Sequence, residues 1–596
     1  MKSGFPRVLA RLCSANLLVG AIGYLQTVIA EKELLYCFRG YIALAIGAAV
    51  GLLGARHPTS ASRVCLGSTA LLFGYLVTRS LASPDLYVAR FDLYLLLAAL
   101  TVYASAAFVF TTSNQRIGFL TALLCFGIVH VVFSVVQAHV AENLALIFPS
   151  LADLEYRERG AGLYINPDHL AGFLEVIGVL GLSIATWSRW PNWSRVTIGY
   201  LTGVVYLGLA LTGSRGGYLS ALLSLLCFLV LSLFVLRSAG KYRAAKFGGV
   251  GLLVLFAGAT ATWTFIQHNP KLRDRAAQIV TPDRGRYDLW QPAIKQWQLN
   301  PIFGTGSGTY AFYGRQFRSP AMEMDPGDVH NDYLNLLCDY GLVGAAAFAV
   351  FLVVHVRAGL RTVVELGPRR ISGGTLLRSD RLALSIGALS AAAGFALHSV
   401  VDFNLHVPPN ALVLAFVFGI FANTTLGTSR EKERTSVILP IVAAGAAILL
   451  LVQSARLLPG EYYAEEARVA LRDEHPKKAI RLAETALQHE RKNPKIFFYL
   501  GRAWRALGNL NGTDDANRIA YYERALAAFD QARQLSPLDG TYPLDMAMLY
   551  DKMGRFSEAE WMYGVALARD PLSLTATNMY QLHLDEWQNA GTATTR

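Results

Sequence analysis

Charged residues are scarce in this chain. Asp, Glu, Lys and Arg make up only 16% of its 596 residues, whereas soluble proteins carry charge on about a quarter of their residues. Hydrophobic residues make up 53%, and they gather in runs of about 20, the length that crosses the hydrocarbon core of a bilayer. These features exclude an ordinary soluble fold and predict a protein that crosses a membrane many times.

Cysteine is also rare, and its placement excludes two kinds of site. The six cysteines lie in or beside apolar runs and lack the spacing of metal ligands, so neither a disulfide framework nor a cysteine metal centre is expected. The net charge of +12 does not indicate nucleic-acid binding, because most Lys and Arg lie in short loops, where they set membrane orientation. The first apolar run lacks a clear cleavage site, which predicts a retained span rather than a signal peptide.

The hydropathy pattern predicts an all-α fold, a polytopic transmembrane bundle followed by a helical tail. We expect a membrane domain over residues 1–458 and a separate tail domain over 459–596. By the 20-residue criterion the membrane domain holds about thirteen spans. They are expected at 12–30, 34–55, 64–82, 86–110, 117–138, 169–187, 196–212, 216–236, 247–266, 333–356, 382–400, 407–426 and 436–454.

The positive charges fix an expected orientation. Arginines and lysines concentrate in alternate loops, for example at Arg56, Arg116 and Arg357–Arg381, and such loops stay in the cytoplasm. Thirteen spans from a cytoplasmic N-terminus put the tail and the long loop 267–330 on the periplasmic side. Four polar segments then share that side, as a site built from helix ends and loops requires. They are 149–168, Thr212–Gly217, 267–330 and Asp402–Asn410.

One polar stretch stands out at the end of the long loop. Four ionisable residues lie within eight positions, directly before the apolar run Leu334–Val356: Asp325, Asp328, His330 and Asp332. Ionisable groups at a membrane boundary are costly unless they face water or a protein cavity, which makes them functional candidates. They fit a Mg²⁺ or Mn²⁺ site, since carboxylates suit these ions. They also fit a metal-free reaction in which His330 accepts a proton and an acid orients its ring.

Two arginines favour the metal-free interpretation. Arg215 lies between two apolar runs without an acid nearby in sequence, and Arg286 begins an amphipathic segment of the long loop. A guanidinium pairs well with phosphate or carboxylate, so two of them at headgroup depth suit a lipid-linked diphosphate. They would supply the positive charge that a metal would otherwise bring.

Two local motifs of the long loop have less specific interpretations. Trp290, Ile294 and Trp297 share one helical face, which suits either the membrane interface or packing against the bundle. The helix is expected to begin near Asp288, so that Pro292 falls in its first turns. The glycine-rich turn Asn300–Gly308 follows no predicted strand, so nucleotide binding is discounted.

The tail shows spacing typical of tetratricopeptide repeats. One unit carries Gly508, Ala525, Phe529, Ala532 and Pro537; a second carries Gly554, Ala559, Tyr563, Ala566 and Pro571; a weaker one spans 463–494. A period of about 34 residues is that of antiparallel helix pairs in an α-solenoid. Such repeats could bind a protein partner, and a stabilising cap is an equal alternative.

The order of these motifs resembles the O-antigen ligase and Wzy-type polymerase superfamily. The matching stretches are Asn166-Pro-Asp-His-Leu-Ala-Gly172, Gly213-Ser-Arg-Gly-Gly217, Arg286–Gly308, Val329-His-Asn-Asp-Tyr-Leu334 with Gly341-Leu-Val-Gly344, and Asp402-Phe-Asn-Leu-His406. The resemblance implies a multi-pass glycosyltransferase of the bacterial inner membrane, inverting and metal-independent. It would move a glycan from undecaprenyl diphosphate to a lipid A-core, glycan or protein acceptor in the periplasm, without a cofactor.

The resemblance also implies residue roles. His330 looks like the catalytic histidine, and Arg215 and Arg286 look like the diphosphate-binding arginines. The supporting candidates are Asp328, Asp332, Asn166, His169, Asp402 and His406. Alternatives remain: a Wzy-type polymerase, a protein O-oligosaccharyltransferase, and a transporter or scaffold with periplasmic repeats. A transporter is expected to show internal duplication, and we find none in the sequence.

Overall fold

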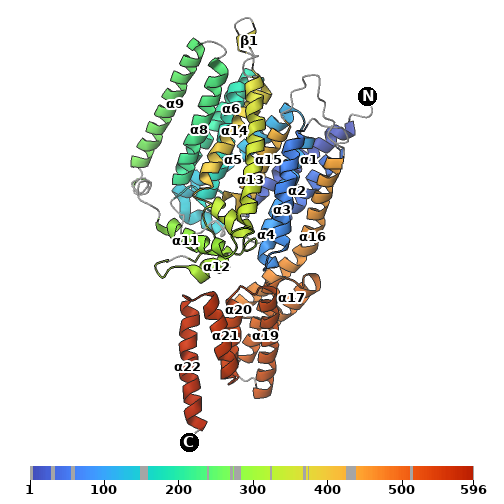
Figure 1. The fold of residues 1–596 in the computed structure, drawn as a ribbon, viewed down its shortest axis with the longest axis vertical. Coiled ribbons are helices and arrows are strands. Elements are labelled where there is room, and N and C mark those ends of the chain that lie inside the picture. The colour runs from blue at the N-terminus through green and yellow to red at the C-terminus, as the bar shows by residue number, and fades with distance from the viewer. Residues whose placement is uncertain are drawn as a thin grey trace.

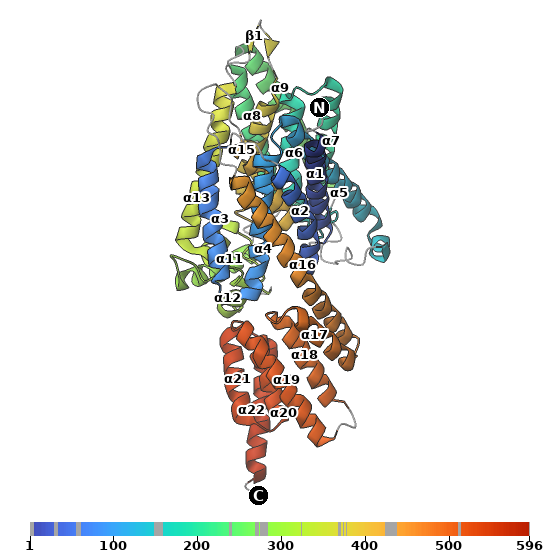
Figure 2. The ribbon, with the colours of Figure 1, turned by 90° about the vertical axis from the view of Figure 1, so that its right-hand side faces the viewer.

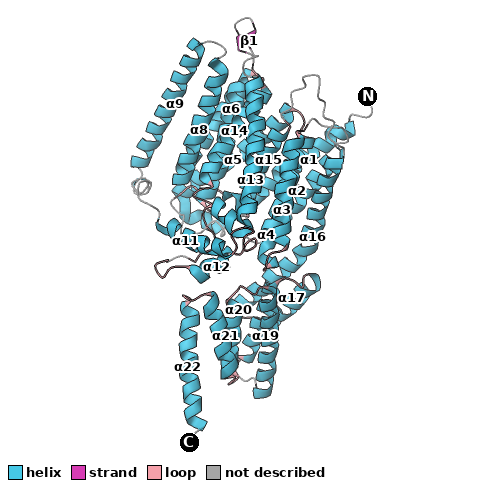
Figure 3. Cartoon of the chain, in the orientation of Figure 1, coloured by secondary structure: helices cyan, strands magenta, loops and turns pink. Residues whose placement is uncertain are grey.

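The computed structural model describes most of the chain. The described residues are 5–28, 34–54, 61–147, 159–237, 241–268, 273, 284–322, 325–366, 371–372, 375–376, 378–423, 438–510 and 514–594. Within them almost every element is a helix (Figure 3). Among the described elements, the exception is a short antiparallel pair of strands, β1 (Ile371–Ser372) and β2 (Thr375–Leu376). The all-α prediction is confirmed. Arg56 and the segments 149–158 and 274–283, used above for orientation and loops, lie outside the described residues, as do the ends of two expected spans, 424–426 and 436–437.

A helix lies at every predicted span. These helices are α1 (Phe5–Thr27), α2 (Leu34–Gly54), α3 (Arg63–Leu81), α4 (Leu86–Ala104, continued by η1, Ser105–Val109), α5 (Ser113–Ile147), α6 (Pro167–Trp187), α7 (Asn192–Leu211), α8 (Arg215–Arg237), α9 (Lys241–His268), α13 (Asp332–Leu366), α14 (Asp380–His398), α15 (Pro408–Ala422) and α16 (Ile438–Arg472). Within the described residues, ten helices are long and apolar enough to cross a membrane. The prediction of a polytopic membrane protein is confirmed.

The long helices run along the long axis of the molecule and form its upper part (Figures 1 and 2). Every residue of α15 is buried, which puts this short helix in the core. Helices α7, α8 and α9 instead expose large apolar side chains such as Trp193, Val230 and Leu253. Exposed apolar faces on several neighbouring helices are typical of contact with lipid.

Side-chain caps fix where three of the helices begin. Asp85 accepts hydrogen bonds from the backbone N–H groups of Tyr87 and Val88 at 3.0 and 3.1 Å, before α4. Asn166 accepts one from Asp168 N at 2.9 Å, before α6. Asn331 accepts two at 3.0 Å in the first turn of α13. Each cap stabilises a helix start by about 1 kcal/mol. Asn166, a candidate site residue, thus has a structural role at the start of α6.

Helix α13 is broken near its start. Gly341 has φ 64° and ψ −167°, which is not helical, and the glycine-rich turn Asn300–Gly308 packs into the break. Thr305 N donates to Cys338 O at 2.8 Å, and Leu342 N donates to Pro301 O at 2.9 Å. These bonds satisfy backbone groups that the break releases, as a broken helix in an apolar bundle requires. The turn therefore has a structural role, because it supplies the hydrogen-bond partners that α13 lacks at the break.

Two shorter helices lie across the end of the bundle that faces the tail (Figure 1). They are α11 (Arg284–Leu299) and α12 (Tyr310–Phe317). The predicted start near Asp288 is wrong, because α11 begins at Arg284 and contains Pro292 in its interior. Proline removes the hydrogen bond to the carbonyl four residues earlier and crowds that carbonyl, but the turn that precedes this carbonyl can still form.

The aromatic residues of α11 pack against the bundle. Trp290 and Trp297 are half-buried against an apolar cluster that contains Ala293, Tyr310 and Cys338. The thiol of Cys338 also donates to Ala293 O at 3.1 Å. This favours the packing alternative for the aromatic face over a position at the lipid interface.

The tail continues directly from the last long helix of the bundle. Helix α16 continues through Pro459 to Arg472 without a loop. It is followed by α17 (Pro476–His489), α18 (Pro494–Gly508), α19 (Asp515–Leu535), α20 (Thr541–Lys552), α21 (Phe556–Arg569) and α22 (Leu574–Thr594). Small residues predicted to pack between helices are buried, among them Ala525, Ala532, Ala559 and Ala566. The tetratricopeptide assignment and the domain boundary at 458/459 stay predictions.

Polar contacts join the tail to the end of the bundle. Tyr87 OH donates to Glu461 Oε2 at 3.2 Å. The other pairs are Asp85 with Ser536, Arg90 with Glu490 at 3.3 Å, and Arg318 with Asp570 at 2.7 Å. The tail therefore lies against the start of α4 and against the segment that follows α12.

The fold predicts opposite membrane sides for two loops. The β1–β2 segment lies at the end of the bundle remote from the tail (Figure 1). Topology reporters fused at Gly373 and at Gly512, both outside the described residues, should therefore report opposite sides of the membrane. The same side for both would contradict the bundle.

The break in α13 predicts that the stability of the fold depends strongly on glycine at position 341. A Cβ there would lie 2.3 Å from Ile302 O, and this backbone region, essentially restricted to glycine, costs another residue roughly 1–3 kcal/mol. Gly341→Ala should lower the apparent unfolding temperature of the purified protein in detergent. Gly445→Ala is the control, because a Cβ at that helical position meets no atom within 4 Å and alanine favours helix. Equal unfolding temperatures for the two variants would contradict this account of the break.

Candidate functional site

His330 lies directly before α13 in a strained backbone conformation. Its φ is 51°, an uncommon value for a residue other than glycine and one that concentrates at functional sites. Its side chain is 30% exposed, and Nδ1 lies 3.5 Å from Asp402 Oδ1. The ring meets Phe403 edge-on, with centroids 4.6 Å apart. Asp402 and Phe403 thus hold the ring from one side, with Nδ1 toward the carboxylate.

Asp402 is buried and charged. It is 1% exposed, and it accepts a hydrogen bond from Phe403 N at 2.9 Å. Burial alone would raise the pKa of Asp402, but the hydrogen bond from His330 and the positive charges of His169 and His398 hold this pKa below its ordinary value. The carboxylate is therefore ionised at neutral pH. An ionised partner at Nδ1 fixes the tautomer in which Nε2 carries the lone pair, as a general base requires.

Two further buried residues continue this row into the bundle. His398 Nε2 lies 3.7 Å from Asp402 Oδ2, and His398 Nδ1 lies 3.1 Å from Glu175 Oε2. His330, Asp402, His398 and Glu175 thus form a continuous row, which we call the histidine row. The sequence analysis missed His398 and Glu175. Their occurrence inside apolar runs was the signal that could have identified them.

The turn before α8 packs against the histidine row. A Cβ on Gly216 would lie 3.3 Å from His398 Nε2, so the backbone next to Arg215 approaches the ring closely. Arg159 holds this turn: its Nε donates to Thr212 O at 2.7 Å, and its Nη2 pairs with Asp168 Oδ1 at 2.7 Å. Arg159 is a positioning residue that the sequence analysis did not single out. The start of α8 also favours an anion, since helix N-termini carry partial positive charge.

The remaining candidates on this side have distinct positions. Arg215 is half-buried in the first turn of α8. His169 meets Phe403 edge-on, with ring centroids 4.8 Å apart. Arg286 is half-buried near the start of α11, the helix that contacts Cys338 of α13. The diphosphate role of Arg215 and Arg286 stays a prediction.

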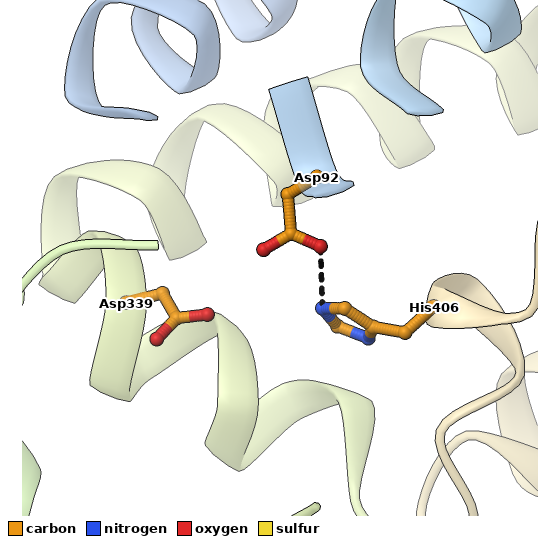
Figure 4. A group of neighbouring side chains, drawn as sticks. All are labelled: Asp92, Asp339 and His406. Carbon is orange, nitrogen blue, oxygen red and sulfur yellow. Dashed lines mark ion pairs between the residues drawn. The ribbon is translucent and has the colours of Figure 1, made fainter. Parts of the chain in front are cut away.

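A second group of ionisable residues lies beside the first. His406 Nδ1 lies 3.2 Å from Asp332 Oδ1, and His406 Nε2 lies 3.9 Å from Asp92 Oδ1. The Asn335 amide nitrogen is 3.0 Å from both His406 Nε2 and Asp339 Oδ2. Figure 4 shows Asp92, Asp339 and His406 facing one another from three segments. We call these five residues the acidic group; the sequence analysis had found only Asp332 and His406 among them.

The four ionisable residues that the sequence placed together do not form one site. His330 faces Asp402, and Asp332 faces His406. Asp325 pairs with Arg315 at 2.6 Å and is exposed. In the described part of the chain, the group with the spacing of metal ligands is Asp92, Asp339 and His406, whose ligand atoms all lie within 4.8 Å of one another. The structure thus gives no support to a cation site made of the 325–332 residues.

A cavity of about 250 Å³ opens at the acidic group. Asp92, Asp339 and Asp328 line it from the bundle, and Glu461 and Tyr499 line it from the tail. A second, mostly apolar cavity of about 150 Å³ lies between α3, α4, α13 and α15 and ends at Asp92, Asp332 and His406. Asp328, a predicted supporting residue, therefore lies at a cavity wall close in sequence to His330.

The family comparison agrees with the motif resemblance. The model of the O-antigen ligase family matches residues 200–349, a range that contains Arg215, Arg286 and His330. This match supports the O-antigen ligase and Wzy superfamily for residues 200–349, and it supports a ligase or polymerase type of membrane enzyme. The tail lies outside the match. No curated protein matches the chain.

Proposed function

We propose that the protein transfers a glycan from an undecaprenyl-diphosphate-linked donor to an acceptor on the periplasmic face of a bacterial inner membrane. The observation that carries the proposal is the position of His330 beside a buried carboxylate. Its Nδ1 faces the buried Asp402 carboxylate at 3.5 Å, and it lies within the range matched by the O-antigen ligase family. The end of the bundle that bears His330 and the tail is then the periplasmic end.

The chemistry follows from the orientation of His330. Its Nε2 takes the proton of an acceptor hydroxyl, and the resulting oxygen attacks the anomeric carbon of the donor sugar. The bond from that carbon to the diphosphate oxygen breaks, and undecaprenyl diphosphate leaves as an anion. Attack opposite the leaving group inverts the anomeric configuration. The ionised Asp402 stabilises the imidazolium that forms, which is the usual task of such a carboxylate.

Arginines rather than a metal ion hold the leaving diphosphate in this proposal. Arg215 lies at the start of α8, whose N-terminal backbone also favours an anion. Arg286 lies on α11, at the same end of the bundle (Figure 1). Charge-assisted, planar hydrogen bonds from guanidinium groups to phosphate are strong and directional, and they stabilise charge as it develops on the leaving group.

The ligase, polymerase and protein-glycosylating alternatives share this donor chemistry and differ in the acceptor. The non-enzyme alternatives, a transporter or a scaffold, give no reason for a histidine held in a left-handed conformation against a buried carboxylate. The ionised state of Asp402 favours an enzyme, because a fixed anion behind a partly exposed imidazole prepares it for proton transfer.

The test is transfer by the purified protein with lipid-linked donor and acceptor. His330→Ala should reduce the transfer rate by roughly 10²–10⁴, the usual contribution of a positioned base, while donor binding is retained. His475→Ala is a matched control, since His475 is exposed in the tail. EDTA should leave the rate of the native protein nearly unchanged.

Two results would contradict the proposal. Full activity of His330→Ala would remove this residue from the mechanism. Loss of activity in EDTA with recovery in Mg²⁺ or Mn²⁺ would replace the metal-free reaction with a metal-dependent one.

A further inference from the structure

The cavity at the acidic group is built jointly by the bundle and the tail. From the bundle come Asp92 and Asp339, and from the tail come Glu461, Lys495 and Tyr499. The two sides are tied at its wall, where Tyr87 OH donates to Glu461 Oε2 at 3.2 Å. The cavity is therefore complete only when the tail lies against the bundle.

Its walls combine aromatic rings with hydrogen-bond acceptors. Tyr87, Phe91 and Tyr499 line it beside the carboxyl groups. Flat rings can stack on the apolar C–H face of a sugar, and carboxylate oxygens accept hydrogen bonds from its hydroxyl groups. A pocket with apolar walls and a few convergent polar groups is typical of a small-molecule site.

One buried oxygen of this cavity has no hydrogen-bond partner among the described residues. Asp339 is 1% exposed, and its Oδ2 accepts from Asn335 Nδ2 at 3.0 Å and from Gly308 N at 3.3 Å. Its Oδ1 has no hydrogen-bond partner within the described chain. Leaving a buried acceptor unsatisfied is costly, and Figure 4 shows this carboxylate turned toward Asp92 and His406. A ligand hydroxyl placed between them would satisfy it, because a hydroxyl group both donates and accepts hydrogen bonds.

The charge of the cavity argues against a phosphate. Five carboxylic acid side chains line it, against one lysine and one histidine, His406. Like charges in a confined site of low dielectric repel strongly, so the diphosphate of the donor is disfavoured here. An uncharged sugar, rich in hydroxyl donors, fits the same walls.

We propose that this cavity binds the terminal uncharged sugar of the acceptor glycan, with its hydroxyl groups donating to Asp339 and Asp92 and its ring stacked on Tyr499. This assignment deepens the proposed transferase function and rests on it. Asp328 lines the cavity two residues before His330, so one loop contributes both to the cavity wall and to the histidine row. The tail, through Tyr499 and Glu461, becomes part of acceptor recognition.

Direct binding to the full-length protein in nanodiscs tests the proposal. Two fluorescently labelled probes are used, called neutral because their terminal sugar is uncharged. They are the phosphatase-treated core oligosaccharide of the host lipopolysaccharide, and the oligosaccharide released by mild acid from the host lipid-linked glycan and treated with phosphatase. At least one should bind. Its Kd should rise about fivefold in Tyr499→Ala, from the lost stacking, and roughly tenfold or more in Asp339→Asn. Tyr462→Ala, at a 43% exposed position of α16, should leave the Kd unchanged.

A second readout separates this proposal from the transferase itself. In Tyr499→Ala the KM for the acceptor should rise, while the slow hydrolysis of donor by water should be unaffected, because water needs no sugar subsite. Absence of any transfer or hydrolysis by the native protein would contradict the transferase function, and the binding assay would still decide on the cavity.

Three outcomes would contradict the proposal that this cavity binds an acceptor sugar. The first is that neither neutral probe binds, or that Tyr499→Ala and Asp339→Asn bind as the native protein does. The second is tighter binding of the lipid-linked-glycan probe that retains its phosphate. The third is equilibrium dialysis showing one Mn²⁺ per native chain, lost in Asp339→Asn, with unchanged binding of the neutral probes. That result would make Asp92, Asp339 and His406 a cation site instead.

Discussion

Burying carboxylates at the end of an apolar bundle costs free energy. The ion pairs and hydrogen bonds that offset this cost hold separate parts of the chain together. A buried charge must be paired and hydrogen-bonded to be tolerated. Asp402 lies between His330 and His398, Asp332 faces His406, and Asp168 pairs with Arg159. The pairs His330–Asp402 and Asp332–His406 join segments far apart in the sequence, whereas Arg159–Asp168 and His398–Asp402 are local. The pairing therefore fixes helix ends and loops relative to one another, and in doing so it places the candidate catalytic histidine.

The loop between α14 and α15 has residues in both ionisable groups. Asp402 belongs to the histidine row, whereas His406 belongs to the acidic group. The start of α13 is divided in the same way, with His330 toward the first group and Asp332 toward the second. Arg159 and Arg215 lie near the histidine row, and the carboxyl groups of the cavity lie beside the acidic group. Our account assigns the donor diphosphate to the first side and the acceptor sugar to the second.

The sequence predicted the features that depend on local composition. Apolar runs of membrane length identified a helix at every span, including the separation of α7 from α8 at Thr212–Gly217. Clustering of ionisable residues drew attention to His330, and polar loops identified Asp402 and His406. The start of α11 was misplaced, because the presence of Pro292 says little about the turn upstream of it.

What the sequence did not reveal depends on contacts across the chain. Asp92, Glu175, Asp339 and His398 are single ionisable residues in separate apolar runs, and nothing local shows that they meet. The break at Gly341 is likewise invisible locally, since it exists because the turn Asn300–Gly308 satisfies the released backbone groups. The separation of donor and acceptor sides follows from these long-range contacts alone.

The most direct test of that separation is a cryo-electron microscopy structure of the full-length protein in nanodiscs with a non-transferable phosphonate analogue of the lipid-linked donor. The account predicts diphosphate density on the side of the histidine row, with phosphate oxygens within about 4 Å of the Arg215 guanidinium, the range of an ion pair. Diphosphate density in the cavity lined by Asp92, Asp339 and Tyr499 would contradict it.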